Sequence, residues 1–363
     1  MSSNRRCCRR FVNVIKYHRD TGEIIWQQNP ICGLDTTDAS GDRLKTYSMH
    51  RVVYEPVNNL LWVVTNGFKT DPNSLESMRA VALNPDGEHV ATCIEKTPGV
   101  RRLYDSGPES QNTMHQGGGY PVFQNAADSN YNRINADGTV NASLSYSAGP
   151  DREKFVVHSS GDLILSSVET VTPEGRQRRD DWSAVNTFDV LAVNIFDRVI
   201  SIDGADNVLT VRGTGYYVLD APDWKTFRSI DGATGSVLAG TFTHTSRMNE
   251  AVGLSSGHVV LHRDGRVSLV DATGSLSSSF VDSYTDGNDV DAHLAASDDA
   301  IIVGGPDDTD PALRPMVRAY DHSGTLLWRQ RWISYGVLRS VAIDGDGHVV
   351  AVGAYGLRVA DPL

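Results

Sequence analysis

Short runs of alternating apolar and polar residues recur along the chain, and most of them end at a turn that contains Asp, Asn or Ser followed by Gly. The stretch "EAVGLSSGHVVLH" at 250–262 alternates on both sides of Ser256–Gly257. A period of two residues is typical of strands that bury one face, and glycine supplies the positive φ that a tight turn needs. No amphipathic pattern extends beyond about three helical turns. The sequence therefore predicts an all-β protein built from hairpins.

The hairpin turns recur at long and fairly regular intervals. Successive turn glycines are mostly 39 to 65 residues apart, with one gap of 97, and they are Gly22, Gly87, Gly138, Gly235, Gly274 and Gly324. The wide gap predicts a further unit with a degraded turn, for which residues 182–196 are the candidate. Seven units of about 52 residues have the size of propeller blades. We expect a single seven-bladed β-propeller of four-stranded antiparallel blades, with six or eight blades as alternatives.

The two ends of the chain carry similar segments, "KYHRDTGEIIWQ" at 16–27 and "RAYDHSGTLLWRQ" at 318–330. The chain begins with an outer hairpin at 11–27 and ends with an inner hairpin at 339–353. Joining the two halves would complete one blade and leave no open sheet edge between them. We therefore expect the ring to close by strand pairing between 11–27 and 339–360, with residues 11–363 forming the propeller.

Charge and composition narrow the classes of partner. The formal net charge of −12 disfavours phosphate backbones and anionic membranes. The exception is the predicted basic tail at residues 1–10, where Arg5, Arg6, Arg9 and Arg10 could contact nucleic acid or an acidic surface. No run has the length and apolarity of a signal peptide or a membrane span. The expected location is cytoplasmic, or in a virion if the chain is encoded by a phage.

Three turn segments resemble the tryptophan-docking repeat of pyrroloquinoline-quinone-type propellers, Ala-x-Asp-x-x-Thr-Gly-x-x-x-Trp. The first, "KYHRDTGEIIW", keeps the Thr, Gly and Trp, but has Lys16 and His18 in place of the Ala and Asp. "SIDGATGSVLA" keeps the Asp, Thr and Gly, but has Ala239 in place of the Trp. "AYDHSGTLLW" keeps the Ala, Asp, Gly and Trp, with a turn one residue shorter.

The resemblance implies a structural role for the residues that match it. In such repeats the Trp packs flat against the next blade, and the Thr-Gly turn sets the twist of the hairpin. The expected blade-docking residues are therefore Trp26, Trp328, Gly22, Gly235 and Gly324. The resemblance concerns the repeat architecture rather than an enzyme, because fold alone does not assign chemistry.

Candidate metal and catalytic motifs are weak. "IDGDGHV" at 343–349 resembles part of a calcium loop, but apolar Val349 and Val350 follow it, so a hairpin turn is the better interpretation. "GPDDTDP" at 305–311 has carboxylates for a surface cation but no defined ligand spacing. We expect no catalytic residues, no resident metal and no cofactor, with a surface Ca²⁺ as an unsupported alternative.

Three function classes remain, and the first is favoured. A propeller without a convergent catalytic set suits a structural or protein-interaction platform in a larger assembly, of which a virion or phage-tail component is one version. A carbohydrate-binding propeller would stack sugars on exposed aromatic residues, for which the candidates are Trp182, Tyr216, Tyr217 and Trp224. A propeller hydrolase, lyase or quinone-dependent oxidoreductase is the third class, since its residues could converge from separate blades.

Overall fold

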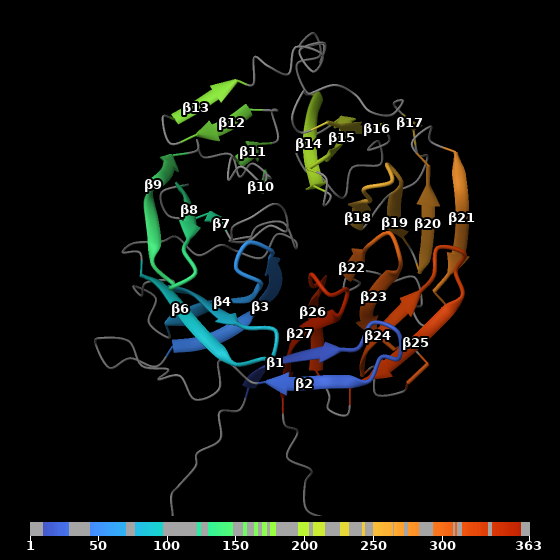
Figure 1. The fold of residues 1–363 in the computed structure, drawn as a ribbon, viewed down its shortest axis with the longest axis horizontal. Helices are drawn as coiled ribbons and strands as arrows, with labels where there is room; N and C mark the ends of the chain where they lie inside the picture. Colours follow the sequence, from blue (N-terminus) through green and yellow to red (C-terminus); the bar gives the residue numbers. More distant parts are fainter. Residues whose placement is uncertain are drawn as a thin grey trace, which may run out of the picture.

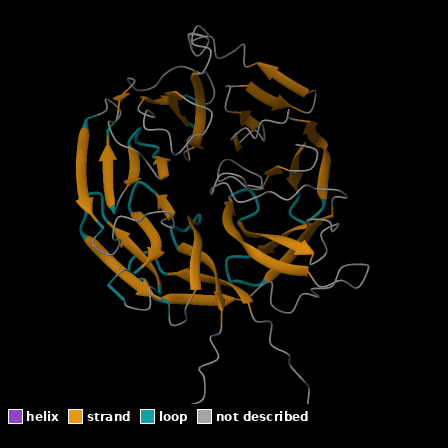
Figure 2. Ribbon diagram, turned by 180° about the vertical axis from the view of Figure 1, so that it is seen from behind, coloured by secondary structure: helices purple, strands orange, loops and turns teal. Residues whose placement is uncertain are grey.

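The computed structural model describes the chain in segments, and every element among them is a strand or a turn (Figure 2). The described residues are 10–28, 44–69, 77–96, 122–124, 130–147, 155–157, 163–165, 169–172, 175–178, 195–202, 206–214, 226–231, 242–243, 250–263, 265–271, 275–282, 293–307, 309–310, 314–332 and 336–356. Within these segments, no helix has the length and apolarity to span a bilayer.

The described strands form six four-stranded sheets and one three-stranded sheet, all antiparallel. Two sheets come from the first half of the chain: β3–β6 (Leu44–Glu55, Leu60–Lys69, Ser77–Leu83, His89–Lys96) and β7–β9 (Val122–Gln124, Asn130–Ile134, Val140–Ser147). Two follow in the middle: β10–β13 (Phe155–Val157, Leu163–Leu165, Glu169–Thr172, Gly175–Arg178) and β14–β17 (Ile195–Ile202, Val208–Thr214, Thr226–Ile230, Phe242–Thr243). Two more lie near the end: β18–β21 (Glu250–Gly253, Val259–Arg263, Arg266–Val270, Leu276–Val281) and β22–β25 (His293–Ala296, Ile301–Pro306, Pro315–Tyr320, Leu326–Arg331).

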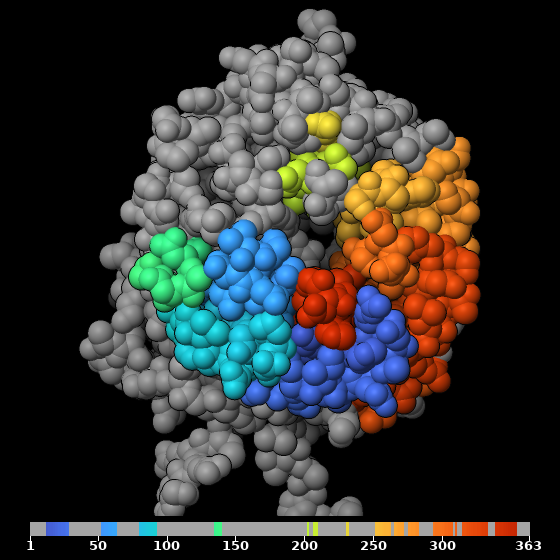
Figure 3. Space-filling view, in the orientation of Figure 1, coloured from blue at the N-terminus to red at the C-terminus, as the bar shows by residue number. Residues whose placement is uncertain are grey.

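The remaining sheet, here called the terminal sheet, combines both ends of the chain. Its strand order is β2-β1-β27-β26, with β1 at Arg10–Tyr17, β2 at Ile24–Gln28, β26 at Gly336–Ile343 and β27 at Val349–Gly356. Strands β1 and β27 pair without a break, from Arg10 opposite Gly356 to Tyr17 opposite Val349. Figure 3 shows the N-terminal strands in blue directly beside the C-terminal strands in red.

The sheets lie around a common centre (Figure 1). Strands β3, β18, β22 and β26 lie nearer this centre, and β2, β21 and β25 lie at the periphery. This all-β arrangement of four-stranded antiparallel sheets is consistent with a β-propeller. Because successive strands are antiparallel, the turns β1–β2 and β26–β27 lie on the same face of the molecule. We call the side that carries these turns the turn face.

The core lies between neighbouring sheets, and each side of the terminal sheet is buried. On β1, Val12 and Val14 pack against residues of the β3–β6 sheet such as Leu61. The alternate residues Ile15 and Tyr17 belong to a second cluster with residues of the β22–β25 sheet. This is the two-residue alternation of a strand buried on both sides. It directs Lys16, which follows Val14 by two positions, towards the β3–β6 sheet.

Most of the predicted turns are present. Positive φ angles occur at the turn glycines Gly22, Gly87, Gly138, Gly257, Gly324 and Gly347, which confirms these hairpins. The expected unit in the long gap is also present, but earlier than 182–196. The hairpin β12–β13 at 169–178 is the outer half of the β10–β13 sheet, and its turn lacks the Asp-Gly signal. Residues 182–194 lie outside the described residues, and 195–196 begin β14 of the next sheet.

Candidate functional site

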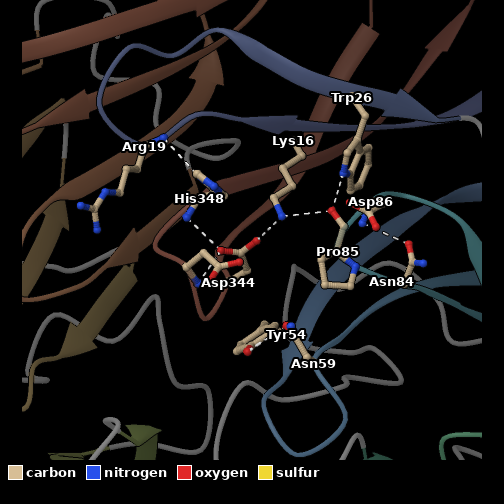
Figure 4. A network of polar contacts seen from close by, with 11 residues as sticks. Lys16, Arg19, Trp26, Tyr54, Asn59, Asn84, Pro85, Asp86, Asp344 and His348 are labelled. Atoms are coloured by element: carbon tan, nitrogen blue, oxygen red, sulfur yellow. Dashed lines mark hydrogen bonds and ion pairs between the residues drawn. The ribbon is translucent and has the colours of Figure 1, made fainter.

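A polar cluster lies on the turn face at the boundary between the terminal sheet and the β3–β6 sheet (Figure 4). We call it the Lys16 cluster, and it comprises Lys16 of β1, the turn residues His18 and Arg19, Pro85 of the β5–β6 turn, and Asp344 and His348 of the β26–β27 turn. These residues come from three separate turns and both ends of the chain. None of them was predicted as a site residue. The available sequence signal is Lys16 itself, which replaces the Ala of the docking repeat.

Lys16 is buried and joins two sheets. Its side chain is 3% exposed, and its Nζ lies 2.7 Å from Oδ2 of Asp344, whose side chain is 4% exposed. The same Nζ donates a hydrogen bond of 3.1 Å to the carbonyl oxygen of Pro85 in the neighbouring sheet. A buried ammonium group is tolerated when it has a counter-ion and hydrogen-bond acceptors. Lys16 therefore connects the β26–β27 turn to the β5–β6 turn.

Asp344 also holds its own turn. Its Oδ1 accepts hydrogen bonds from the backbone N–H groups of Asp346 at 3.0 Å and His348 at 2.9 Å. The tight turn closes with Gly347 at a φ of +78°. This geometry confirms the hairpin interpretation of 343–349. Within the described segments, no group of three or more His, Cys, Asp or Glu residues is placed to hold a metal ion.

Two histidines meet beside this ion pair. The imidazole rings of His18 and His348 have centroids 5.2 Å apart and planes inclined at 46°. Burial lowers the pKa of His348, while the nearby Asp344 carboxylate acts in the opposite direction. Both rings are partly buried on the turn face, so the pKa of His348 depends on its burial and on these neighbouring charges.

The predicted docking residues lie at the contacts between sheets. The Trp328 ring packs on Gly22, where an added Cβ would be 2.6 Å from the ring, and its Nε1 donates to the carbonyl of Arg19 at 2.6 Å. Trp26 packs on Gly87, and its Nε1 donates to the carbonyl of Pro85 at 2.8 Å. In both cases the acceptor is the second residue of a turn in the next sheet.

The same contact recurs where tryptophan is absent. Phe280 of β21 packs on Gly324, where an added Cβ would lie 2.5 Å from the ring. The indole donor is replaced by Ser278, whose Oγ donates to the carbonyl of His322 at 2.5 Å. His322 is again the second residue of its turn. Sequence reasoning missed this pair because only tryptophan was sought at the donor position.

Other predicted residues lie outside the described part of the chain. These are the docking residue Gly235, the proposed sugar-binding residues Trp182, Tyr216, Tyr217 and Trp224, and Arg5, Arg6 and Arg9 of the basic tail. Arg10 is the first residue of β1. The assignments for these residues stay predictions.

Two carboxylates of "GPDDTDP", those of Asp307 and Asp310, pair with arginines, and Asp308 lies outside the described residues. Asp307 is buried, and its Oδ1 accepts a hydrogen bond from the hydroxyl of Thr309 at 2.5 Å. Its other oxygen forms an ion pair with Arg331. Asp310 lies 2.5 Å from Nε of Arg314. These carboxylates therefore have arginine partners within the same sheet or beside it.

Exposed apolar residues occur at one repeat position on the peripheral strands of four neighbouring sheets. We call this set the rim residues, and it consists of Ile24 and Ile25 on β2, Val90 on β6, Leu276 on β21, and Leu326 and Leu327 on β25. Their exposed fractions range from 37% for Leu326 to 60% for Leu276. In each strand they follow the turn glycine by two or three positions. These strands are the outermost of their sheets, so one edge of each has no partner strand among the described residues.

No protein-family model and no curated protein sequence matches the chain. Solved structures of similar fold include Sqt1 of Chaetomium thermophilum bound to the N-terminus of the ribosomal protein L10, at 10% identity and a TM-score of 0.47, covering 85% of this chain and 96% of that one. The C-terminal WD40 domain of Sif2 has 12% identity and a TM-score of 0.39, covering 86% and 98%. Regucalcin, a calcium-binding protein from Agrobacterium tumefaciens, has 11% identity and a TM-score of 0.38, covering 72% and 83%. Because the TM-scores are below 0.5, these similarities assign neither a family nor a ligand to this chain.

Proposed function

We propose that this chain is a seven-bladed β-propeller that acts as a protein-interaction platform in a larger assembly. In this proposal each of the seven sheets is one blade, and the pairing of β1 with β27 closes the ring. The register of that pairing supports the closure, because it runs unbroken over the whole of β1. The repeated docking of an aromatic ring on a turn glycine of the next sheet supports a tryptophan-docking type of propeller.

The rim residues carry the proposal of an interaction role. Isolated exposed apolar residues are common on proteins, but apolar residues that recur at the same repeat position on the outer strands of neighbouring sheets indicate a contact surface. Leu276, Ile24 and Leu327 are 60%, 52% and 47% exposed. An open strand edge beside them offers backbone donors and acceptors to a partner. The combination suits another protein better than a small ligand.

A virion or phage-tail component is one version of this proposal, and it rests on the sequence alone. Carbohydrate binding is a different proposal that depends on residues outside the described segments. The identity of the bound partner would distinguish these two proposals from the general proposal of a protein-interaction platform. The interaction role itself can be tested without knowing that identity.

The test compares the native mass of assemblies purified from the natural source with wild-type protein and with the double variant Ile25→Lys, Leu327→Lys. The expected result is a stoichiometric assembly for wild type that is lost in the double variant. Val57→Lys is the matched control, because Val57 is 54% exposed but lies in the β3–β4 turn. A monomeric wild-type protein, or an assembly unaffected by the rim variant, would overturn the proposal. Circular dichroism checks that each variant is folded.

A further inference from the structure

The contact between His18 and His348 joins two turns that are far apart in the sequence. His18 begins the β1–β2 turn, and His348 ends the β26–β27 turn. Each side chain is partly buried, and the ring centroids are 5.2 Å apart. Two imidazoles at this separation are compatible when neutral, whereas two imidazolium ions would repel one another.

Both rings use Nδ1 as a hydrogen-bond acceptor. The backbone N–H of Arg19 donates to Nδ1 of His348 at 3.3 Å, and the backbone N–H of Asp20 donates to Nδ1 of His18 at 3.3 Å. An accepting Nδ1 requires a neutral ring with its proton on Nε2. Protonation would turn Nδ1 into a donor that faces another donor. Each contact is therefore available only to the neutral imidazole.

Charged groups of both signs surround the pair. The side chain of His348 faces Asp344 and Asp346 of its own turn, Lys16 of β1, and His18. The guanidinium of Arg19 lies against Gly347, where an added Cβ would be 3.5 Å from Nη1. The other titratable groups near these turns are Asp20 and Glu23 on the β1–β2 turn and Tyr54 on β3, whose own pKa is raised mainly by burial and also by Asp344 and Asp346.

The balance of these groups disfavours protonation of His348. Burial has the largest effect and lowers the pKa of His348 below its ordinary value of 6.5, and Lys16 and His18 lower it further. Asp344 and Asp346 oppose this change. A histidine with a lowered folded-state pKa binds protons more weakly when folded, so the folded contact is fully stable above pH 6.5 and is weakened as the pH falls below that value.

We propose that His18 and His348 form an acid-sensitive latch, in which the contact of neutral His348 with the β1–β2 turn holds that turn against the β26–β27 turn and is released when His348 is protonated. The latch is independent of the proposed interaction role, because it needs no partner. On release, the Arg19 N–H loses its acceptor in the β26–β27 turn, and the β1–β2 turn is loosened at this point while strands β1 and β27 stay paired.

Release of the β1–β2 turn would also affect its contact with the neighbouring β22–β25 sheet. The carbonyl of Arg19 accepts the hydrogen bond from Trp328, and Gly22 of the same turn receives the Trp328 ring. The turn that carries the latch is therefore also the docking site of the next sheet. Acid would weaken this contact between the terminal sheet and the β22–β25 sheet. Contacts between other sheets would be unaffected by these two histidines.

Hydrogen exchange measured by mass spectrometry tests the latch. The observable is exchange of the 18–23 segment at about pH 7.5 and pH 5.0, corrected for the intrinsic chemical rate. We expect wild-type exchange to increase about tenfold or more in acid, since the neutral fraction of an imidazole falls about tenfold per pH unit below its pKa. The double variant His18→Asn, His348→Asn should lose this response, because Asn retains an acceptor oxygen near the position of Nδ1 and does not titrate.

His258→Asn is the matched control. His258 occupies the position of His348 in the β18–β19 turn, and its Nδ1 lies 3.2 Å from the hydroxyl of Ser256 in its own turn. This variant should respond to acid as wild type does. A wild-type segment with no acid response, or an equal response in the double Asn variant, would overturn the proposal.

A second measurement does not depend on a variant. Nitrogen NMR of the imidazole rings in wild-type protein should show the Nε2–H tautomer for both histidines at neutral pH. Protonation of His348 should coincide with a shift of the Arg19 amide resonance. A proton found on Nδ1 of His348 at neutral pH would contradict the latch.

Discussion

Lys16 and Trp26 are direct cross-strand partners on β1 and β2, and both donate a hydrogen bond to the same carbonyl oxygen, that of Pro85. In the β22–β25 sheet the corresponding pair is Ala319 and Trp328. The hydrogen bond from the indole to the next sheet is thus present for both Trp26 and Trp328. Lys16 adds a second hydrogen bond to the same acceptor and an ion pair with Asp344. The terminal sheet has a stronger polar connection to its neighbour than the repeat requires.

Replacing Lys16 by Met should lower the free energy of unfolding by about 3–5 kcal/mol, because the buried carboxylate of Asp344 then lacks its cation. Met fills most of the volume of the lysine stem, so loss of packing is small. Denaturant unfolding measures the change. In the double variant Lys16→Met, Asp344→Asn most of the loss should be recovered, since the amide oxygen can still hold the turn. Equal stability of the single and double variants would contradict the ion-pair account.

Gly22→Ala should destabilise the protein by about 2–4 kcal/mol. Part of this cost comes from a φ of +69°, and part from a Cβ that would lie 2.6 Å from the Trp328 ring. Gly347→Ala separates the two causes, because Gly347 has a φ of +78° but its Cβ would meet only the flexible Arg19 side chain at 3.2 Å. Thermal unfolding of both variants should show the larger loss for Gly22→Ala. The reverse order would argue against tight docking.

Trp328→Phe should cost about 1 kcal/mol beyond the change in ring size, since it removes the donor to the Arg19 carbonyl and keeps an aromatic ring on Gly22. Trp328→Ala should cost about 3–5 kcal/mol, because this side chain is buried between two sheets. Equilibrium unfolding in urea provides the comparison. A Phe variant as unstable as the Ala variant would show that the hydrogen bond, rather than the ring, dominates the contact.

Asp321 should titrate below its ordinary pKa of 3.8. The hydroxyl of Ser323 lowers the pKa most, followed by the backbone N–H of Thr325, and both bond to Oδ1. The folded-state pKa is lowered, so the stabilisation is present above pH 3.8 and is lost as the pH falls through the folded value. Carbon NMR of the carboxyl group measures it. Ser323→Ala should raise the pKa towards 3.8, and an unchanged value in that variant would contradict the assignment.

The general form of the fold could be predicted because most of the hairpins carry their own local signal. Gly22, Gly87 and Gly324 have the positive φ that their turns imply. Strand pairing was expected between 11–27 and 339–360, and β1 and β27 of these two ranges do pair in one sheet. The hairpin at 169–178 was misplaced because Pro173 and Glu174 give no Asp-Gly signal. The number of blades and the closure of the ring remain parts of the proposal.

The Lys16 cluster could not be predicted, because its members are brought together by contacts between sheets. Lys16 and Asp344 are separated by nearly the whole chain, and no local pattern relates them. The sequence shows that Lys16 replaces the Ala of the repeat, but it does not show that Asp344 is its partner. The role of Ser278 could not be predicted for the same reason. Its hydroxyl replaces the indole donor only because the turn of the next sheet places the carbonyl of His322 within hydrogen-bond distance.

The composition of the terminal sheet has a consequence for the order of folding. Strands β1 and β2 are synthesised before the other described strands, yet β27, the strand with which β1 pairs, is synthesised after them. The bond from Trp328 to Arg19 joins residues 309 positions apart. Closing so long a loop is entropically costly and slow. The β1–β2 hairpin must therefore wait, with the β1 edge unpaired, until β27 has been synthesised, and during this interval that edge is open to mispairing.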